Sequence, residues 1–248
     1  QSSFQHLYRL TPVPGLGDFA REEHGLKPVH VEVISGMVYI CLADQPPDLT
    51  RFREAVTPYI APHQPDRTKV AFESILIEEA NWKLVIENNR ECYHCTANHP
   101  ELLVTLVEFA LPDDPRGNAE FQALMKRQAA RWDALGLPHA PVDGGIEFRC
   151  IRLPFHQGAL SFTLDGAPAC RKLLGDFVDP DLGSVRMFRV PNNWNHFLGD
   201  HIIHFRVLPL SANRTELRTT WLVHEDAEEG VDYDVQRLTE VWLATNEQ

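Results

Sequence analysis

The segment from Glu87 to Pro100 contains the residue types that a mononuclear metal site requires. His94 and His99 lie five residues apart, and the carboxylate of Glu91 lies three residues before the first histidine. Two neutral imidazoles and one carboxylate can occupy one face of an octahedral Fe(II) and leave the opposite face for dioxygen and substrate. The segment therefore indicates an iron site of the oxygenase type as one interpretation.

The spacing of the two histidines is a weak indication by itself, because the chain has twelve histidines and two will often lie close together by chance. A zinc-protease helix carries histidines four residues apart, with Glu directly after the first, so that class is excluded. On an ideal helix, two side chains that are five residues apart point in clearly different directions. Both histidines can reach one ion only if the helix is distorted or ends between them, and Pro100 predicts an end near His99. From these residues alone, a metal site and ordinary surface or core histidines are equally open.

The run from Asn81 to Pro100 resembles the iron-binding signature of Rieske-type non-haem iron oxygenases, in the catalytic domain of their large (alpha) subunits. The signature reads Glu-Asn…Glu/Asp-x-Tyr-His-x-x-x-x-His-Pro, and its two histidines bind iron. The resemblance implies that His94 and His99 are metal ligands. It also implies that Glu91 has a catalytic role and connects the first ligand to a Rieske-cluster histidine of a neighbouring subunit. We expect Glu91 and His94, three residues apart, to share a helix face, where Glu91 would also orient the ligand's ring.

Further motifs resemble the branch of this family that demethylates quaternary amines such as glycine betaine and stachydrine (proline betaine). These motifs are Asn89-Arg90-Glu91-Cys92, Ser161–Gly166, Trp194–Phe197, Trp221–His224 and Leu238–Asn246. The branch implies that Fe(II) and O2 hydroxylate an N-methyl group of a small cationic substrate, which then loses formaldehyde. It also implies electrons from NAD(P)H, delivered by a reductase through a [2Fe-2S] Rieske cluster, and a homotrimer. Two alternatives stay open: an aromatic-ring hydroxylating oxygenase, and a helix-grip binding module without chemistry.

Two parts of the family pattern are missing from the sequence. A Rieske cluster is held by two cysteines and two histidines, in Cys-x-His and Cys-x-x-His pairs, and Cys92-Tyr93-His94 has only the first spacing, by accident. In the family, the third iron ligand is an aspartate directly after a Thr-Asn-x-Gln run, which here ends at Gln248. We therefore expect residues 1–46 to be a remnant of a Rieske domain without cluster ligands. Residues 47–248 would be a C-terminally truncated catalytic domain.

Composition and charge agree with a globular enzyme. A chain of 248 residues with 44% hydrophobic content can bury a substantial core, and no apolar run reaches the ~20 residues of a membrane span. The formal charge of −12 argues against nucleic-acid binding and favours a cationic substrate or a basic partner. Five cysteines without framework spacing predict reduced thiols in a cytoplasmic protein.

The hydrophobic pattern predicts an α+β fold. Alternation from Val29 to Leu42 predicts a hairpin, which the resemblance assigns to the Rieske domain. Further strands are predicted at Thr68–Glu78, Ile146–Leu153, Ala159–Leu164, Val185–Val190, His201–Leu208 and Thr215–His224. Helical spacing predicts helices over Asp113–Leu135 and from Val231 to the end, besides the helical segment at Asn81–Ile86. These elements predict a curved antiparallel sheet around a long C-terminal helix, the helix-grip architecture that the resemblance also implies.

The inner face of such a sheet would line the substrate pocket. The aromatic residues on or beside the predicted strands are Phe155, Phe162, Phe188, Trp194, Phe197 and Phe205. An aromatic residue on a strand is more often simple core, but aromatic faces also hold quaternary ammonium ions through cation–π attraction. We expect two or three of these side chains to face the metal, with Phe162 and Trp194 as the leading candidates for substrate binding.

Overall fold

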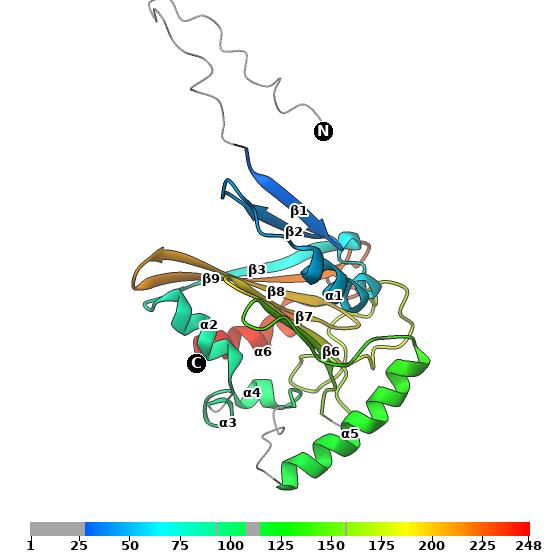
Figure 1. Cartoon of the computed structure of the whole chain (residues 1–248). Helices are drawn as coiled ribbons and strands as arrows, with labels where there is room; N and C mark the ends of the chain where they lie inside the picture. The colour runs from blue at the N-terminus through cyan, green and yellow to red at the C-terminus, as the bar shows by residue number, and fades with distance from the viewer. Residues whose placement is uncertain (1–27, 93, 108–114, 157) are drawn as a thin grey trace, which may run out of the picture.

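A seven-stranded antiparallel sheet forms the centre of the computed structural model, which describes residues 28–92, 94–107, 115–156 and 158–248 (Figure 1). The strand order is β3-β9-β8-β7-β6-β5-β4. The bounds are β3 Thr68–Glu78, β4 Val142–Asp143, β5 Phe148–Leu153, β6 Ser184–Arg189, β7 Asn193–Phe197, β8 Ile202–Ser211 and β9 Arg214–His224. The predicted antiparallel sheet is confirmed.

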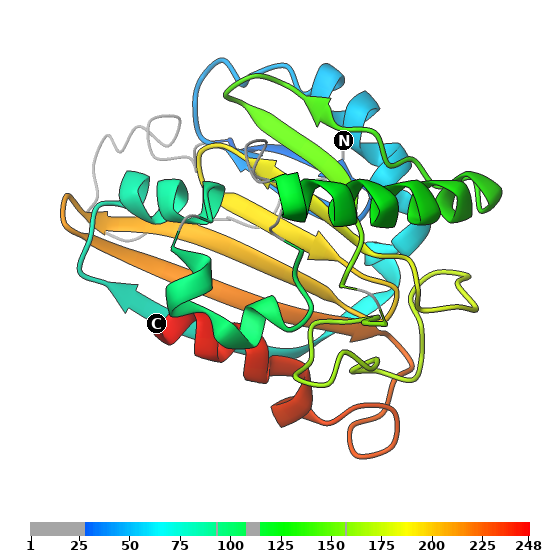
Figure 2. The ribbon, with the colours of Figure 1, turned by 90° about the horizontal axis from the view of Figure 1, so that it is seen from below.

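The inner face of the sheet packs on α6 (Val235–Glu247) and on α2 (Trp82–Arg90), with α3 (Cys95–Asn98) and α4 (Pro100–Leu103) on the same side (Figure 2). The side chain of Asp234 accepts a hydrogen bond from the backbone N–H of Arg237 and so begins α6 at Val235, four residues later than predicted. Leu238 and Trp242 of α6 are buried in the core that this face builds. The expected helix-grip arrangement is therefore confirmed.

The outer face of the sheet is covered by α1 (Thr50–Ile60) and by the hairpin of β1 (His30–Ile34) and β2 (Met37–Cys41) (Figure 1). Phe52 and Val56 of α1 are buried with sheet residues of this face. No helix was predicted at α1, although the spacing of its apolar residues is helical. Pro58 stands inside it, and proline argues against a helix interior.

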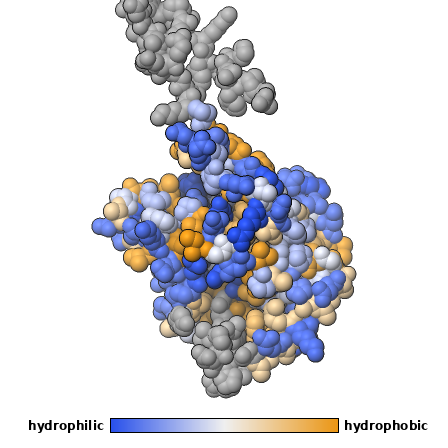
Figure 3. Space-filling view, viewed as in Figure 1, coloured by the Kyte–Doolittle hydropathy of each residue, from blue (hydrophilic) through white to orange (hydrophobic). Residues whose placement is uncertain are grey.

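The hairpin forms where it was predicted. Its turn uses Ser35 and Gly36 at φ +46° and +83°. A Cβ at Gly36 would lie 2.6 Å from the backbone nitrogen of Asp66, so only glycine fits there. One face of the hairpin exposes apolar side chains (Figure 3): Val31, Val33, Val38, Ile40 and Leu42. Residues 1–27 of the predicted 1–46 remnant lie outside the described part of the chain.

The strand predicted at Ala159–Leu164 is wrong, because this segment is a loop. Its polar side chains bond to nearby groups and not to a neighbouring strand. The hydroxyl of Thr163 donates to the carbonyl of Ala167, and Asp165 accepts from the backbone N–H of Ala167. The hydroxyl of Ser161 donates to the buried carboxylate of Asp200.

The helix predicted over Asp113–Leu135 is confirmed as α5, Pro115–Ala134, and Gly136 follows it at φ +67°. The expected start at Asp113 lies outside the described residues. Within the described ranges, no helix combines the length and the apolar character that a membrane crossing needs.

Asn81 fixes the start of α2, the helix that leads to the two histidines. Its side-chain oxygen accepts from the backbone N–H of Lys83 at 3.0 Å, and its amide donates to the carbonyl of Ala212 at 2.7 Å. Asn81→Ala is therefore expected to lower the free energy of unfolding by about 0.5–2 kcal/mol, measured by urea denaturation. Asn81→Asp keeps the acceptor for the helix and should lose less. Equal stability of the Ala variant and the original protein would contradict this role.

Candidate metal centre

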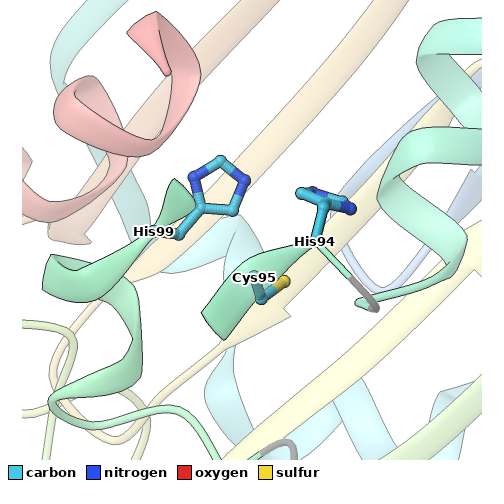
Figure 4. Close-up of side chains that lie close together, drawn as sticks. All are labelled: His94, Cys95 and His99. Atoms are coloured by element: carbon cyan, nitrogen blue, oxygen red, sulfur yellow. The ribbon is translucent and has the colours of Figure 1, made fainter. Parts of the chain in front are cut away.

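The backbone between α2 and α4 brings His94 and His99 together. The helix α2 ends at Arg90, His94 precedes the short α3, and His99 lies between α3 and α4 in a non-helical conformation. The two ring centroids lie 5.0 Å apart with their planes at 81°, and both rings lie on the same side of α3 (Figure 4). A break in the helix was the condition for both histidines to reach one ion, and the structure meets it.

Each histidine ring is oriented by a hydrogen bond from its Nδ1 atom. The Nδ1 of His94 donates to Oε1 of Glu91 at 2.8 Å, and the Nδ1 of His99 donates to Oε1 of Gln248 at 3.1 Å. Such hydrogen bonds leave Nε2 of both rings available as metal ligands. Glu91 makes the expected contact but not from a shared helix face, since its backbone is extended beyond the end of α2.

Cys95 is the third residue of the cluster, whose potential ligand atoms lie within 4.8 Å of one another. Its sulfur forms a disulfide with Cys92, so it is not a free ligand. The expectation that all five cysteines are reduced is therefore wrong for this pair. The turn before α3 places their Cα atoms 5.0 Å apart, within the range that a disulfide spans. Cys41, Cys150 and Cys170 are free thiols.

The donor set therefore fits a metal through two histidine nitrogens. The carboxylate of Glu91 lies close to this pair, but it is hydrogen-bonded to His94 and orients that ring. Two Nε2 atoms, each backed by a hydrogen bond at Nδ1, could supply the two nitrogen ligands of a two-histidine, one-carboxylate site. Such a face suits Fe(II) when one more carboxylate completes it.

A cavity of about 990 Å³ opens beside the histidines. Its lining combines three regions: α2 with the following histidine segment, the inner face of β5 to β7, and the C-terminal half of α6. The lining includes Glu91, His94 and His99 together with Trp194. The structure thus brings four of the five predicted site residues to one cavity.

The predicted aromatic residues divide into cavity lining and core. Phe188 and Trp194 line the cavity and are register partners on β6 and β7. Trp194 also stacks on Phe205, with ring centroids 4.9 Å apart. Trp242 of α6 lines the cavity as well, so the wall near the histidines is strongly aromatic.

Phe162 lies outside the lining. It is fully buried in the loop that replaces the predicted strand. Its ring packs edge-on against Phe155, His196 and Trp242, at centroid distances of 5.0, 5.2 and 5.5 Å. Phe162 therefore packs against two lining side chains, His196 and Trp242, on the side away from the cavity.

Burial favours the uncharged form of two histidines of the sheet, His196 on β7 and His204 on β8. Burial lowers the pKa of His196 well below its ordinary value, and the charges of Arg186 and His201 act in the same direction. Burial lowers the pKa of His204 to about 4, and the charge of Arg206 adds to this. Uncharged imidazoles are therefore expected there at neutral pH.

Sequence reasoning missed Arg186 and His196 as lining residues. They face each other in register on β6 and β7. The strand predicted at Val185–Val190 contained the signal, because alternation places Arg186 and Phe188 on the same face. Gln248 was also missed as a hydrogen-bond partner of His99, since only the folded chain brings the end of α6 to the histidines.

Comparison with known proteins agrees with this geometry. A family model described as the catalytic domain of the ring hydroxylating alpha subunit matches residues 59–248. Glycine betaine monooxygenase oxygenase subunits from Chromohalobacter salexigens and Pseudomonas aeruginosa are 49% and 47% identical over 231 residues. These alignments cover 93% of this chain but 52% and 54% of those proteins. The chain therefore spans about half the length of the curated relatives that it matches.

Among solved structures, the quaternary ammonium Rieske monooxygenase CntA, in complex with an inhibitor, is similar with a TM-score of 0.57. The match has 14% sequence identity and covers 93% of this chain and 50% of that chain. At this identity the likeness shows the fold alone, and it confirms the α+β architecture expected from the sequence. Because the family model matches most of the chain, the protein belongs to the family of ring hydroxylating alpha subunits.

Proposed function

We propose that the full-length protein is the oxygenase component of an oxidative N-demethylase for a small quaternary ammonium compound, such as glycine betaine or stachydrine. The observation that carries the proposal is the pair of Nε2 atoms of His94 and His99, held open beside an aromatic cavity. The 49% identity to a glycine betaine monooxygenase oxygenase subunit supports this class of substrate. A binding module would have no use for Glu91, His94 and His99 together.

His94 and His99 would hold the mononuclear Fe(II) through their Nε2 atoms. Bound iron would activate O2 for insertion into a C–H bond of an N-methyl group. The third ligand is expected to be a carboxylate, as the family resemblance implies. The contact of Gln248 with His99 places the end of α6 beside the histidine pair.

Glu91 would serve two purposes. Its carboxylate holds the ring of His94 in the orientation that presents Nε2 to a metal. By resemblance, it would also connect His94 to a Rieske-cluster histidine of a neighbouring subunit, in a homotrimer. Electrons would come from NAD(P)H through a reductase and a [2Fe-2S] cluster, and this need for NAD(P)H supports a cytoplasmic location.

Residues 1–46 would belong to the Rieske domain and residues 47–248 to the catalytic domain. The exposed apolar face of the hairpin supports this division, since a row of exposed valines is typical of a surface that packs against further chain. The cluster ligands are absent from the sequence of this chain.

The aromatic wall would bind the ammonium group, with Trp194 as the main contact. A betaine should bind more tightly than its neutral isostere, with carbon in place of nitrogen, by about 0.5–2 kcal/mol. Trp194→Leu is expected to remove most of this preference while iron content is unchanged. Phe162→Leu is the control, because Phe162 packs behind the lining and should lower stability more than the preference. Competition binding of the two ligands measures both variants.

The substrate class is tested by formaldehyde release from the full-length oxygenase with its reductase. Glycine betaine, proline betaine and a neutral aromatic acid are compared side by side. The proposal expects formaldehyde from a betaine and none from the aromatic acid. Turnover of the aromatic acid alone would overturn demethylation in favour of ring hydroxylation.

A further inference from the structure

We infer that Arg186 binds the carboxylate of the substrate, so that the cavity selects a zwitterionic betaine over quaternary ammonium compounds without an acid group. The inference rests on the proposed function and narrows its substrate class. It assigns a specificity-determining role to a residue of β6 on the inner face of the sheet, separate from the metal ligands and from the aromatic wall.

The position of Arg186 comes from the alternation of β6. Val185 and Met187 point into the core beneath α1, so Arg186 and Phe188 point to the opposite face. Both line the cavity. Residues two apart on a strand are separated by about 7 Å. A small molecule with a cation at one end and an anion at the other can therefore span the distance from Arg186 to the aromatic wall.

The neighbours of Arg186 favour a polar ligand group at this point. Its register partners are Ile151 on β5 and His196 on β7, and both line the cavity. His196 is uncharged, so it adds hydrogen-bonding capacity without competing for a negative ligand. Two residues further along β6, Phe188 pairs with Trp194, which places the aromatic wall on the same face of the sheet as the guanidinium.

The other arginines of the described lining are more exposed than Arg186. The side chain of Arg149 is 59% exposed, and Arg90 is exposed at the end of α2. Arg186 is half-buried on the inner face of the sheet, where solvent screens the attraction between its guanidinium and a carboxylate less.

The charges of the lining would also orient a zwitterion. On the side of α2 and the histidines, Glu87 and Glu91 outnumber one lining cation, Arg90, whereas Arg149 and Arg186 lie on the sheet. A betaine aligned with this field would turn its ammonium methyl groups toward the histidines and its carboxylate toward Arg186. Orientation is needed because a cavity of about 990 Å³ accommodates a drug-sized ligand, so shape alone does not position a small betaine.

The test compares glycine betaine with choline, which keeps the trimethylammonium group and replaces the carboxylate with an alcohol. KM from formaldehyde release and Kd from calorimetry are measured on the full-length oxygenase with its reductase. Arg186→Gln is expected to raise both constants for glycine betaine about 10- to 100-fold, since hydrogen bonds to charged groups are the strong ones. The constants for choline should change less than about threefold.

Two further variants make the result specific. Arg186→Lys keeps the charge and should recover part of the affinity for glycine betaine, even if the Gln variant folds poorly. Arg67→Gln removes an arginine that lies outside the cavity lining and pairs with Glu225, and it should leave the binding of both ligands unaffected. The inference is overturned if Arg186→Gln binds glycine betaine normally, or if it loses both ligands equally. If the original protein binds glycine betaine but releases no formaldehyde from it, demethylation fails while the binding comparison still decides the role of Arg186.

Discussion

His99→Ala in the full-length protein is expected to remove the iron and to lower formaldehyde formation by more than about 100-fold. Loss of a residue that merely orients a metal ligand typically costs 10- to 100-fold, and loss of the ligand itself should cost more. The same result is expected for His94→Ala, because the two Nε2 atoms would share one ion. Iron per catalytic chain and formaldehyde per minute are the measured quantities.

His139→Ala is a matched control for the two histidine variants. His139 lies outside the cavity and pairs with Asp133 at 3.0 Å. It should keep its iron and its activity. Full iron content in His94→Ala and His99→Ala, with normal thermal stability, would show that the metal lies elsewhere.

Glu91→Gln is expected to keep the fold and the iron and to slow reduction of the iron by the Rieske cluster about 10- to 100-fold. The Gln side chain can still accept the hydrogen bond from Nδ1 of His94 but lacks the negative charge. Stopped-flow spectroscopy of the reduced cluster, mixed with substrate and O2, gives the rate. An unchanged rate would remove the electron-transfer role.

Glu79→Gln provides the control for this experiment. Glu79 follows β3 outside the cavity lining, and its exposed side chain pairs with Arg214 at 3.1 Å. The substitution removes the same charge away from the cavity, so it should leave the rate of cluster oxidation unchanged. Equal slowing in both variants would indicate a general effect of charge, and not a specific connection through Glu91.

Most of the sheet and the C-terminal helix were predictable because their apolar patterns match their burial. No strand was predicted at β7, where every residue is buried and no alternation is visible. β3 runs from Thr68 to Glu78, as the alternation predicted. The segment at Ala159–Leu164 has a similar residue content, but its hydroxyl groups bond to local backbone and to Asp200, and this competition is invisible in a hydrophobic pattern. The helix α1 was not predicted although its apolar residues have helical spacing, because Pro58 inside it argued against a helix.

The candidate site was also predictable only in part. The motif identified His94 and His99, but only the structure shows that the helix stops at Arg90 and that Gln248 reaches His99. Sequence could not separate Trp194 from Phe162, because both are aromatic residues in segments rich in β-formers. Their difference lies in position, since Trp194 lies on a strand facing the cavity and Phe162 lies in a loop behind it.

Metal reconstitution tests the central claim most directly. Iron is removed from the full-length oxygenase with a chelator, and the protein is reloaded with Fe(II) or with Zn(II) before incubation with glycine betaine, reductase, NAD(P)H and O2. The expected result is formaldehyde release that returns with Fe(II) and stays absent with Zn(II), because Zn(II) has no redox chemistry. Formaldehyde release that is independent of the metal, or restored equally by Zn(II), would contradict an iron-dependent oxygenase centred on His94 and His99.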